Sequence, residues 1–332
     1  MDSLTQIFLG IATAELVASK KLQNKTFIYG AILGTLPDLD IIVGKFMSDV
    51  DGVAIHRGLS HSLLFFIFLA PLLGLLISRI EKGKIDFKRA SWMAFWCLVT
   101  HVLLDMFTSW GTQILWPLDY RFALKTIFVI DPLYTIPLLV ALIYVWKNKD
   151  PFLRRKYLNR GLLISSFYLL LTCVLKLAAV NQFEKALKHQ NITYQELIVK
   201  PTAFNTILWN ANIATTDGYY LSDYSFLDSQ PIAFKHYKKN NTLEKRLEHN
   251  EDFQKLKHIS EGWYLITEDP QSLYFNDLRF GLLNDNPEHP QFAFSYQFIT
   301  NKNGKQIAIE VPKAKRDGKA LLQNIFTRIK GN

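Results

Sequence analysis

Long apolar runs dominate the first half of the chain, and charged residues mark their ends. No Asp, Glu, Lys or Arg lies between Arg57 and Arg79, and residues 63–77 are almost entirely apolar, so this run is long enough to cross a bilayer. Three further runs lack those four residue types and reach about 20 residues with their flanks. They are residues 90–104, 132–146 and 161–175.

Two shorter apolar runs come first, at residues 3–14 and 26–37. Their length allows either a tight hairpin across the membrane or segments that enter it without crossing. The pattern therefore predicts an α-helical polytopic membrane domain of about six apolar segments, of which the first two are either spanning or re-entrant.

The pattern changes near residue 181, beyond which polar, charged and aromatic residues alternate as in a water-soluble domain. We predict a membrane-embedded helical domain at residues 1–181, which carries the candidate site, and a soluble α+β domain at residues 182–332. Aromatic and β-branched segments between turn residues predict strands, and longer segments predict helices. The strands are expected at residues 206–213, 218–226, 262–267, 292–300 and 306–311, and the helices at 181–189, 243–257 and 313–330.

Basic residues predict the orientation of the chain. Lys and Arg gather after the first, third and fifth apolar segments, and such loops are retained in the cytoplasm. The candidate site and the C-terminal domain then lie on the non-cytoplasmic side. The net charge of +9 is mainly this orientation signal, and we expect no nucleic-acid partner. Cys97 and Cys173 both lie in apolar segments, so neither disulfides nor thiolate metal ligands are expected.

Several ionisable residues lie at the edges of the apolar segments. Such groups cost a few kcal/mol each beside hydrocarbon, so a cluster on one face of the membrane indicates a functional site. They are Asp38 and Asp40 in Gly-Thr-Leu-Pro-Asp-Leu-Asp, His56 and His61 in His-Arg-Gly-Leu-Ser-His-Ser, and His101 and Asp105 in Thr-His-Val-Leu-Leu-Asp.

The spacing of these residues allows them to converge, although simpler roles exist for each pair. His101 and Asp105 are four residues apart and share a helix face, where they either bind one ion or form a hydrogen bond between helices. Asp38 and Asp40 follow Pro37, which favours a break that would let both carboxylates reach one centre. Their alternative is a helix cap and a solvated turn.

The chemistry of the whole set favours a metal centre. Gly58 lets the backbone bend between His56 and His61, which adds two imidazoles to the carboxylates. Imidazole and carboxylate suit zinc, manganese or iron, and a set without Cys is typical of catalytic zinc. We therefore predict a divalent metal, with zinc as the first choice and manganese or iron as alternatives, that lowers the pKa of bound water towards about 7.

Two arginines indicate an anionic substrate. Arg57 and Arg121 lie on the side where the positive-inside rule disfavours them, and guanidinium binds phosphate well. For Arg121 the alternative is a contact with Asp119 or anchoring to lipid head groups. Asp131, directly before Pro132, is a candidate ligand, general base or hydrogen-bond partner of a ligating histidine.

The motifs quoted above, with Met-Asp-Ser-Leu-Thr-Gln at the start and Gly-Thr-Gln after Asp105, resemble a known family over residues 1–145. It is the LexA-binding, inner-membrane-associated family of bacterial metal-dependent hydrolases. Its distant similarity to zinc-dependent phospholipase C implies a helical metal site and phosphoester hydrolysis. Gln6 stands where many members have His, and Asp40 is a further candidate position beside the implied ligands. The implied ligands are Asp38, His56, His61, His101 and Asp105.

Residues and resemblance together predict a multi-pass hydrolase of the bacterial inner membrane. Metal-activated water would cleave a phosphoester or related bond in a membrane lipid or lipid-linked anionic substrate, on the non-cytoplasmic side. Arg57 and Arg121 would hold the anion, and Asp131 or Asp40 would transfer protons. The alternatives are a translocator, a metal-binding envelope factor and a lipid-binding scaffold in which the C-terminal half acts.

Overall fold

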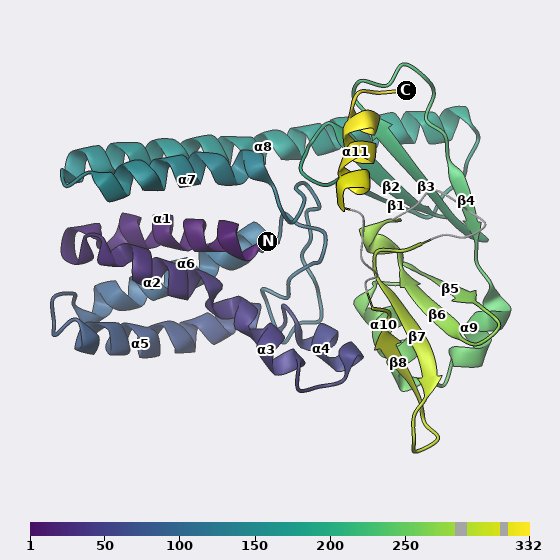
Figure 1. The fold of residues 1–332 in the computed structure, drawn as a ribbon, viewed down its shortest axis with the longest axis horizontal. Coiled ribbons are helices and arrows are strands. Elements are labelled where there is room, and N and C mark those ends of the chain that lie inside the picture. Colours follow the sequence, from purple (N-terminus) through teal and green to yellow (C-terminus); the bar gives the residue numbers. More distant parts are fainter. Residues whose placement is uncertain (283–290, 313–317) are drawn as a thin grey trace. The chain divides into compact units, whose positions relative to one another are not determined.

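A computed structural model describes residues 1–282, 291–312 and 318–332, and the chain divides into two compact units (Figure 1). The predicted boundary at residue 181 and the observed division at Val174 both fall inside one long helix, α8 (Pro151–His189). Segment Val43–Ala54 belongs to the second unit, which the sequence analysis does not anticipate. We call the units helical and sheet. The helical unit comprises Met1–Ile42, Ile55–Val174 and Ala203–Asn205, and the sheet unit comprises Val43–Ala54, Leu175–Thr202 and Thr206–Asn332.

All six predicted apolar segments are helical. Three helical stretches, Lys25–Gly44, Leu63–Ile80 and Pro151–His189, are long and apolar enough to cross a membrane, so six crossings stay a prediction. Short helices α3 (Asp40–Gly44) and α4 (Asp49–Ile55) extend across the division between units. The other helices are α1 (Ser3–Leu22), α2 (Lys25–Thr35), η1 (Leu36–Leu39), η2 (Leu59–His61), α5 (Leu63–Ile80), α6 (Phe87–Asp105) and α7 (Pro132–Lys147).

Glycines bring α1 and α2 into direct backbone contact. A Cβ atom at Gly10 would lie 2.3 Å from the carbonyl oxygen of Gly30, and one at Gly34 would lie 2.6 Å from that of Gln6. Helices packed in lipid commonly approach through small residues in this way. Cys97 of α6 is fully buried against the same surface, with Sγ 3.4 Å from the Gly10 oxygen. The three helices therefore have little freedom to shift.

A buried ion pair joins four helices near the ends that carry basic residues. Nε and Nη2 of Arg154 in α8 each lie 2.8 Å from a carboxylate oxygen of Glu15 in α1. Arg154 Nη1 also donates to Asn24 Oδ1 at 2.6 Å and to the Val145 carbonyl at the end of α7. Thr26 of α2 donates to Glu15 at 2.6 Å. Because every charged atom of the pair has a partner, its burial is compensated.

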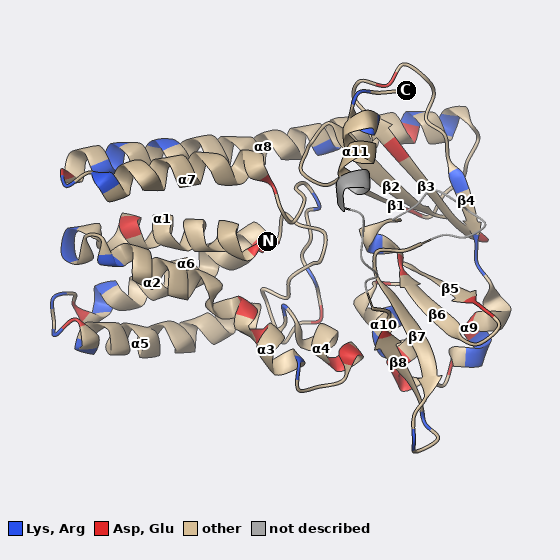
Figure 2. Ribbon diagram, viewed as in Figure 1, with Lys and Arg blue, Asp and Glu red and all other residues tan. Residues whose placement is uncertain are grey.

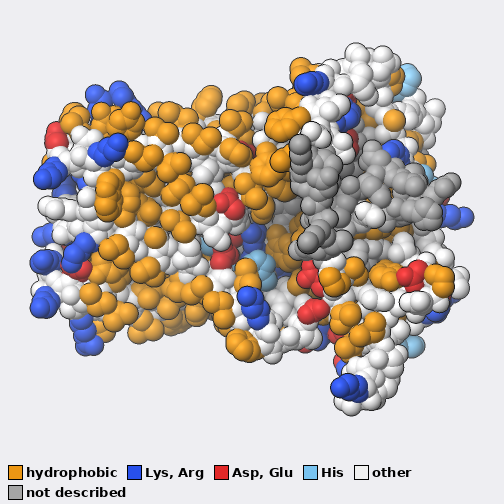
Figure 3. Space-filling model, in the orientation of Figure 1, with side chains coloured by type: hydrophobic (Ala, Val, Ile, Leu, Met, Phe, Trp, Pro, Cys, Tyr) orange, Lys and Arg blue, Asp and Glu red, His pale blue; other side chains and the backbone are white. Residues whose placement is uncertain are grey.

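The surface of the helical unit fits a lipid environment. Apolar side chains cover the visible face of its helices (Figure 3). The side chains of Phe68, Leu163 and Leu170 are each about two thirds exposed. Lys and Arg gather at one end of these helices (Figure 2). A large exposed apolar surface bounded by charge is what a membrane-embedded protein presents.

The sheet unit contains two four-stranded antiparallel sheets, with strand orders β1-β2-β3-β4 and β5-β6-β7-β8. All five predicted strands are present, whereas β1, β4 and β6 were not predicted. Their bounds are β1 (Glu196–Pro201), β2 (Leu208–Ala214), β3 (Gly218–Ser225), β4 (Lys235–Lys238), β5 (Tyr264–Glu268), β6 (Leu273–Asp277), β7 (Ser295–Thr300) and β8 (Gln306–Glu310).

The sheet unit also contains helices. The predicted helix at residues 243–257 is two helices, because Asn250 accepts a hydrogen bond from the Phe253 N–H at 3.0 Å and begins a new helix. Residues 313–317 of the predicted C-terminal helix lie outside the described residues. The helices are α9 (Asn241–Leu247), α10 (Glu251–Ile259), the single turn η3 (Leu278–Phe280) and α11 (Gly318–Ile329).

We expect Arg154→Ala to lower the free energy of unfolding by about 3–5 kcal/mol, because it leaves Glu15 buried without its countercharge. The neighbouring Arg155 is exposed, so Arg155→Ala is the matched control and should change stability little. Thermal unfolding in detergent, followed by circular dichroism, measures both. Equal effects of the two variants would show that the buried pair does not stabilise the unit.

Candidate metal centre

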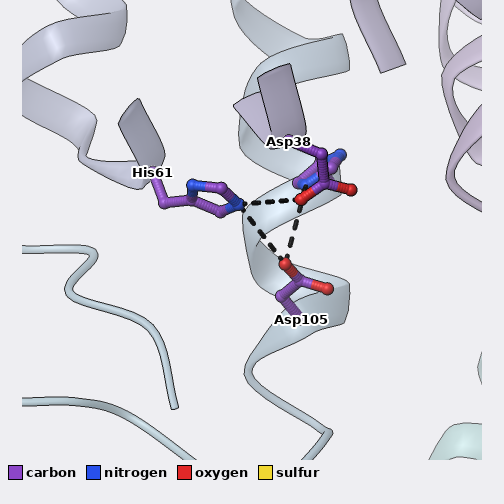
Figure 4. Close-up of side chains that lie close together, drawn as sticks. Asp38, His61 and Asp105 are labelled. Atoms are coloured by element: carbon purple, nitrogen blue, oxygen red, sulfur yellow. Dashed lines mark hydrogen bonds and ion pairs between the residues drawn. The ribbon is translucent and has the colours of Figure 1, made fainter. Parts of the chain in front are cut away.

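Four of the five predicted ligands converge in the helical unit. One ligand atom from each of Asp38, His61, His101 and Asp105 lies within 4.8 Å of the others. Figure 4 shows how Asp38, His61 and Asp105 point toward one another. Asp38 Oδ1 is 3.3 Å from Nε2 of His61 and 3.5 Å from Nε2 of His101. Asp105 Oδ2 is 3.6 and 3.5 Å from the same two nitrogens. Two carboxylates and two imidazoles thus face one point, and together they could hold a metal ion.

Local structure explains how these side chains meet. Pro37 and Asp38 both lie in the single turn η1, which directly follows α2. His61 ends the turn η2, directly before α5. His101 and Asp105 lie four residues apart in the last turns of α6 and share a face of that helix. Sequence spacing predicted this last pair directly.

The hydrogen bond of His101 fixes which ring nitrogen faces the centre. His101 Nδ1 lies 2.7 Å from the carbonyl oxygen of Gly34, which can only accept, so Nδ1 carries the proton. When the ring is neutral, Nε2 presents its lone pair on the side of Asp38 and Asp105. Nε2 of His101 and Oδ2 of Asp105 are buried and have no hydrogen-bond partner among the described residues. Such facing, unsatisfied atoms fit a ligand set for an ion.

The second imidazole is oriented in the same way. His61 Nδ1 is 2.9 Å from Ser60 Oγ, whose hydroxyl donates to Asp40 Oδ2 at 2.6 Å. Because that hydroxyl proton is engaged, Ser60 accepts from Nδ1–H, and Nε2 of His61 faces the centre. A carboxylate behind a histidine is a common second layer of metal sites. Asp40, predicted as a proton-transfer residue, therefore orients His61.

His56 lies outside the group of four, although the sequence analysis predicts it as a ligand. Its Nδ1 is 2.9 Å from Asp40 Oδ1, and its ring is 5.9 Å from that of His61, measured between centroids. The pairing with Asp40 gives His56 an oriented ring with Nε2 as the remaining nitrogen. Spacing alone could not separate this arrangement from ligation.

Arg57 lies directly beside the centre. Its Nη2 is 3.2 Å from Asp105 Oδ1, and its Nη1 donates to Thr108 Oγ1 at 3.0 Å. Only 4% of Arg57 is exposed, and its Nε is buried without a hydrogen-bond partner in the part of the chain that the structure describes. The residue has a φ of 60°, a strained conformation for a residue with a Cβ, and its backbone N–H donates to Asp40 Oδ2 at 3.1 Å.

Gln6 occupies the position where the resemblance expects histidine. Its Nε2 donates to Asp105 Oδ1 at 3.0 Å and to the His101 carbonyl at 3.2 Å. Its Oε1 is buried and makes no hydrogen bond to any described residue. The amino group of Met1 also contacts Asp105 Oδ1. Gln6 therefore supports Asp105 and leaves one oxygen close to the centre.

Arg121 and Asp131 are not among the four converging ligands. Arg121 Nη1 donates to the carbonyl of His56 at 3.1 Å and so holds the backbone of that loop. Asp131 caps α7, with Oδ1 accepting from the Leu133 N–H at 3.0 Å and Oδ2 from the Tyr168 hydroxyl at 2.8 Å. Oδ1 of Asp131 therefore serves as a helix cap, and Oδ2 links α7 to Tyr168 of α8.

Sequence reasoning missed Ser60, Thr108 and the Gly34 carbonyl. Thr108 accepts from Arg57 and donates to the Asp105 carbonyl at 2.7 Å. Ser60 directly precedes His61, and Thr108 follows Asp105 by three residues, so both were visible as polar neighbours of candidate ligands. No sequence signal marks a backbone carbonyl such as that of Gly34.

The acidic surroundings change the protonation of His61. Burial alone lowers the pKa of the His61 imidazole, but the carboxylates of Asp105, Asp38 and Asp40 outweigh this effect and raise the pKa to about 9. The ring therefore carries a proton at neutral pH when no ion is bound. An ion bound by Nε2 must displace that proton.

The apolar helices and the buried group of histidines and aspartates define a membrane protein with a candidate metal centre. The model of the YdjM inner membrane protein family matches residues 1–183, and the chain belongs to this family. It is 22% identical over 232 residues to the uncharacterized protein YfhP of Bacillus subtilis, which covers 67% of each chain. It is 36% identical over 114 residues to the inner membrane protein YbcI of Escherichia coli, covering 32% of this chain and 62% of the relative.

The chain thus spans about two thirds of the length of these two curated relatives. No solved structure matches it significantly. Family membership and the apolar helices agree on a membrane location, and the printed names of the relatives describe no reaction.

We expect zinc binding at pH 7 to release at least one proton per ion, because the pKa of His61 is about 9 in the absence of an ion. Proton release should decrease as the pH rises through 9. Calorimetric titration in buffers of different ionisation enthalpy measures the number of protons. Zinc binding without proton release at pH 7 would show that Nε2 of His61 is not a ligand.

Proposed function

We propose that this chain is a multi-pass, metal-dependent hydrolase of the inner membrane. Its substrate would be a phosphoester or related bond in a membrane lipid or lipid-linked anionic molecule. One observation carries the proposal: four ligand atoms lie within 4.8 Å, and both imidazoles are oriented by hydrogen bonds behind them. A donor set of two nitrogens and two oxygens suits zinc, with manganese or iron as alternatives.

The residues around the centre fit hydrolysis of an anionic ester. Asp38, His61, His101 and Asp105 would hold the divalent ion, which would supply an activated water as the nucleophile. The buried guanidinium of Arg57, with Nε free of hydrogen bonds to the described residues, would bind the anion beside the centre. With Nδ1 engaged by Asp40, His56 can take up or release a proton at Nε2. We therefore assign proton transfer to His56 and orientation to Asp40.

The charge distribution supports a non-cytoplasmic site. Lys and Arg gather at one end of the helical unit, and the aspartates of α3 and η1 lie at the other end of its helices (Figure 2). The positive-inside rule then places the basic end in the cytoplasm and the centre on the opposite face. Helix α8 begins among the basic residues and ends in the sheet unit, which favours the same side for that unit.

Burial of the ligands favours one alternative, a non-enzymatic envelope protein that binds metal structurally. The side chains of His61, His101 and Asp105 are fully buried, and that of Asp38 is 16% exposed. Closed coordination is typical of structural zinc, whereas catalytic zinc keeps a position for water. The two functions make the same prediction for metal content and opposite predictions for turnover.

We expect protein purified in detergent to contain near-stoichiometric zinc, manganese or iron, and His61→Ala and His101→Ala to lose it. His236→Ala, in the sheet unit and partly exposed, is the matched control and should keep the metal. Elemental mass spectrometry measures the content of all four proteins. Absence of metal from the wild type after reconstitution would exclude the proposed function and make the lipid-binding scaffold the preferred alternative.

Turnover separates the enzyme from the structural alternative. We expect the metal-loaded protein to release phosphate or a phosphorylated head group from vesicles of bacterial phospholipids or polyprenyl phosphates. His56→Ala should keep its metal and lose about 100-fold or more in rate, because proton transfer contributes about that factor. His236→Ala should retain wild-type rates. A fully loaded protein that cleaves none of these substrates would favour the structural role.

A further inference from the structure

The chain leaves the helical unit between two of its candidate metal ligands. Asp38 lies before the excursion and His61 after it, both in the helical unit. Residues Val43–Ala54 in between belong to the sheet unit. We call this segment the 43–54 hairpin. Its two ends therefore continue directly into the two segments that supply ligands and their supporting residues.

The hairpin is compact because two glycines touch. A Cβ atom at Gly52 would lie 2.9 Å from the carbonyl oxygen of Gly44, and one at Gly44 would lie 3.1 Å from the Cα of Gly52. The end of α3 and the middle of α4 consequently approach backbone to backbone. A displacement of α4 would therefore displace the end of α3 as well.

The hairpin is anchored in the core of the second sheet. Val50 of α4 is fully buried in a cluster that includes Leu247 of α9, Phe253 of α10 and Phe275 of β6. The backbone N–H of Glu310 in β8 donates to Asp49 Oδ2 at 2.8 Å. Lys255 of α10 forms an ion pair with Asp51, which adds an exposed and weaker contact.

The base of the excursion lies in the helical unit and is closed by Asp40. Its Oδ2 accepts hydrogen bonds from the backbone N–H of Arg57 at 3.1 Å and from Ser60 Oγ at 2.6 Å. The same carboxylate group pairs with His56, and Ser60 contacts His61. The distance between Asp38 and His61 thus depends on the two chain segments that flank the hairpin.

We propose that the sheet unit positions the metal ligands through the 43–54 hairpin, with Val50 as the positioning residue. Docking of α4 on the second sheet holds the segments of Asp38 and His61 at the spacing that an ion requires. Release of α4 lets these segments separate and weakens metal binding. The claim about metal binding rests on the proposed function. The mechanical claim, that docking of α4 fixes the spacing of the two segments, does not.

Hydrogen exchange of the full-length protein in detergent tests the mechanical part without metal. The backbone N–H groups of Arg57 and His61 report on the base of the excursion, since they donate to Asp40 Oδ2 and to the Gly58 carbonyl. We expect Val50→Asp, and to a lesser degree Val50→Ala, to speed exchange in residues 36–42 and 55–62. Val50→Ile keeps a β-branched apolar side chain and should show the exchange rates of the wild type.

Leu247→Ala is the matched control, because Leu247 is fully buried in the same core but lies on α9. It should loosen the sheet unit and leave exchange in residues 36–42 and 55–62 unchanged. Wild-type exchange in these residues when residues 43–54 exchange freely would overturn the inference. So would an equal effect of Leu247→Ala and Val50→Asp.

Metal affinity is the second measurement. Zinc titration should give a Kd at least about tenfold weaker for Val50→Asp than for the wild type or Leu247→Ala, a typical coupling between two sites. Unchanged affinity in Val50→Asp would contradict the inference while the proposed function stands. If the wild type binds no zinc, the proposed function fails, and the exchange measurement still decides whether the hairpin positions these segments.

Discussion

The carboxylate of Asp105 is fully buried at the end of an apolar helix, and most of the candidate centre follows from the need to compensate its charge. Arg57, Gln6 and both imidazoles direct donors or positive charge at its two oxygens. Removal of an ionised carboxylate from water costs several kcal/mol unless such partners surround it. Two of the atoms involved, Asp105 Oδ2 and His101 Nε2, still lack a hydrogen bond among the described residues. The amino group of Met1 also contacts this carboxylate, so its charge has partners, and the two atoms without a hydrogen bond are where a cation would complete the site.

Parts of the site that depend on local spacing could be predicted, whereas the roles that depend on distant partners could not. His101 and Asp105 share a helix face because they are four residues apart, and that rule needs no other part of the chain. His56 and His61 are equal candidates by spacing, and only Asp40 separates them, since it pairs with one and orients the other through Ser60. Asp131 precedes Pro132, an arrangement that favours a helix cap, so its structural role was open to prediction.

The fold shows the same limit. Apolar runs identified the helices, but Arg154, which the orientation rule counts as a loop cation, is buried against Glu15, 139 residues away in the chain. Strands β1, β4 and β6 pair with neighbours along the chain, but they were missed because each is short and includes charged residues. Nothing in the composition of residues 43–54 indicates that Val50 completes a core formed by residues between Leu243 and Ala308. Contacts between distant segments decide the roles of Arg154 and Val50.

The glycine contact between α1 and α2 has a consequence for how the centre can vary. Gly34 gives its carbonyl to His101, and the same residue touches the backbone of Gln6 so closely that a side chain there would push the two helices apart. A change in the separation of α1 and α2 would therefore also change the orientation of the His101 imidazole. A substitution that adds a single methyl group at a residue without any ligand atom would rotate a ligand, so the chemistry of the centre constrains positions that never touch an ion.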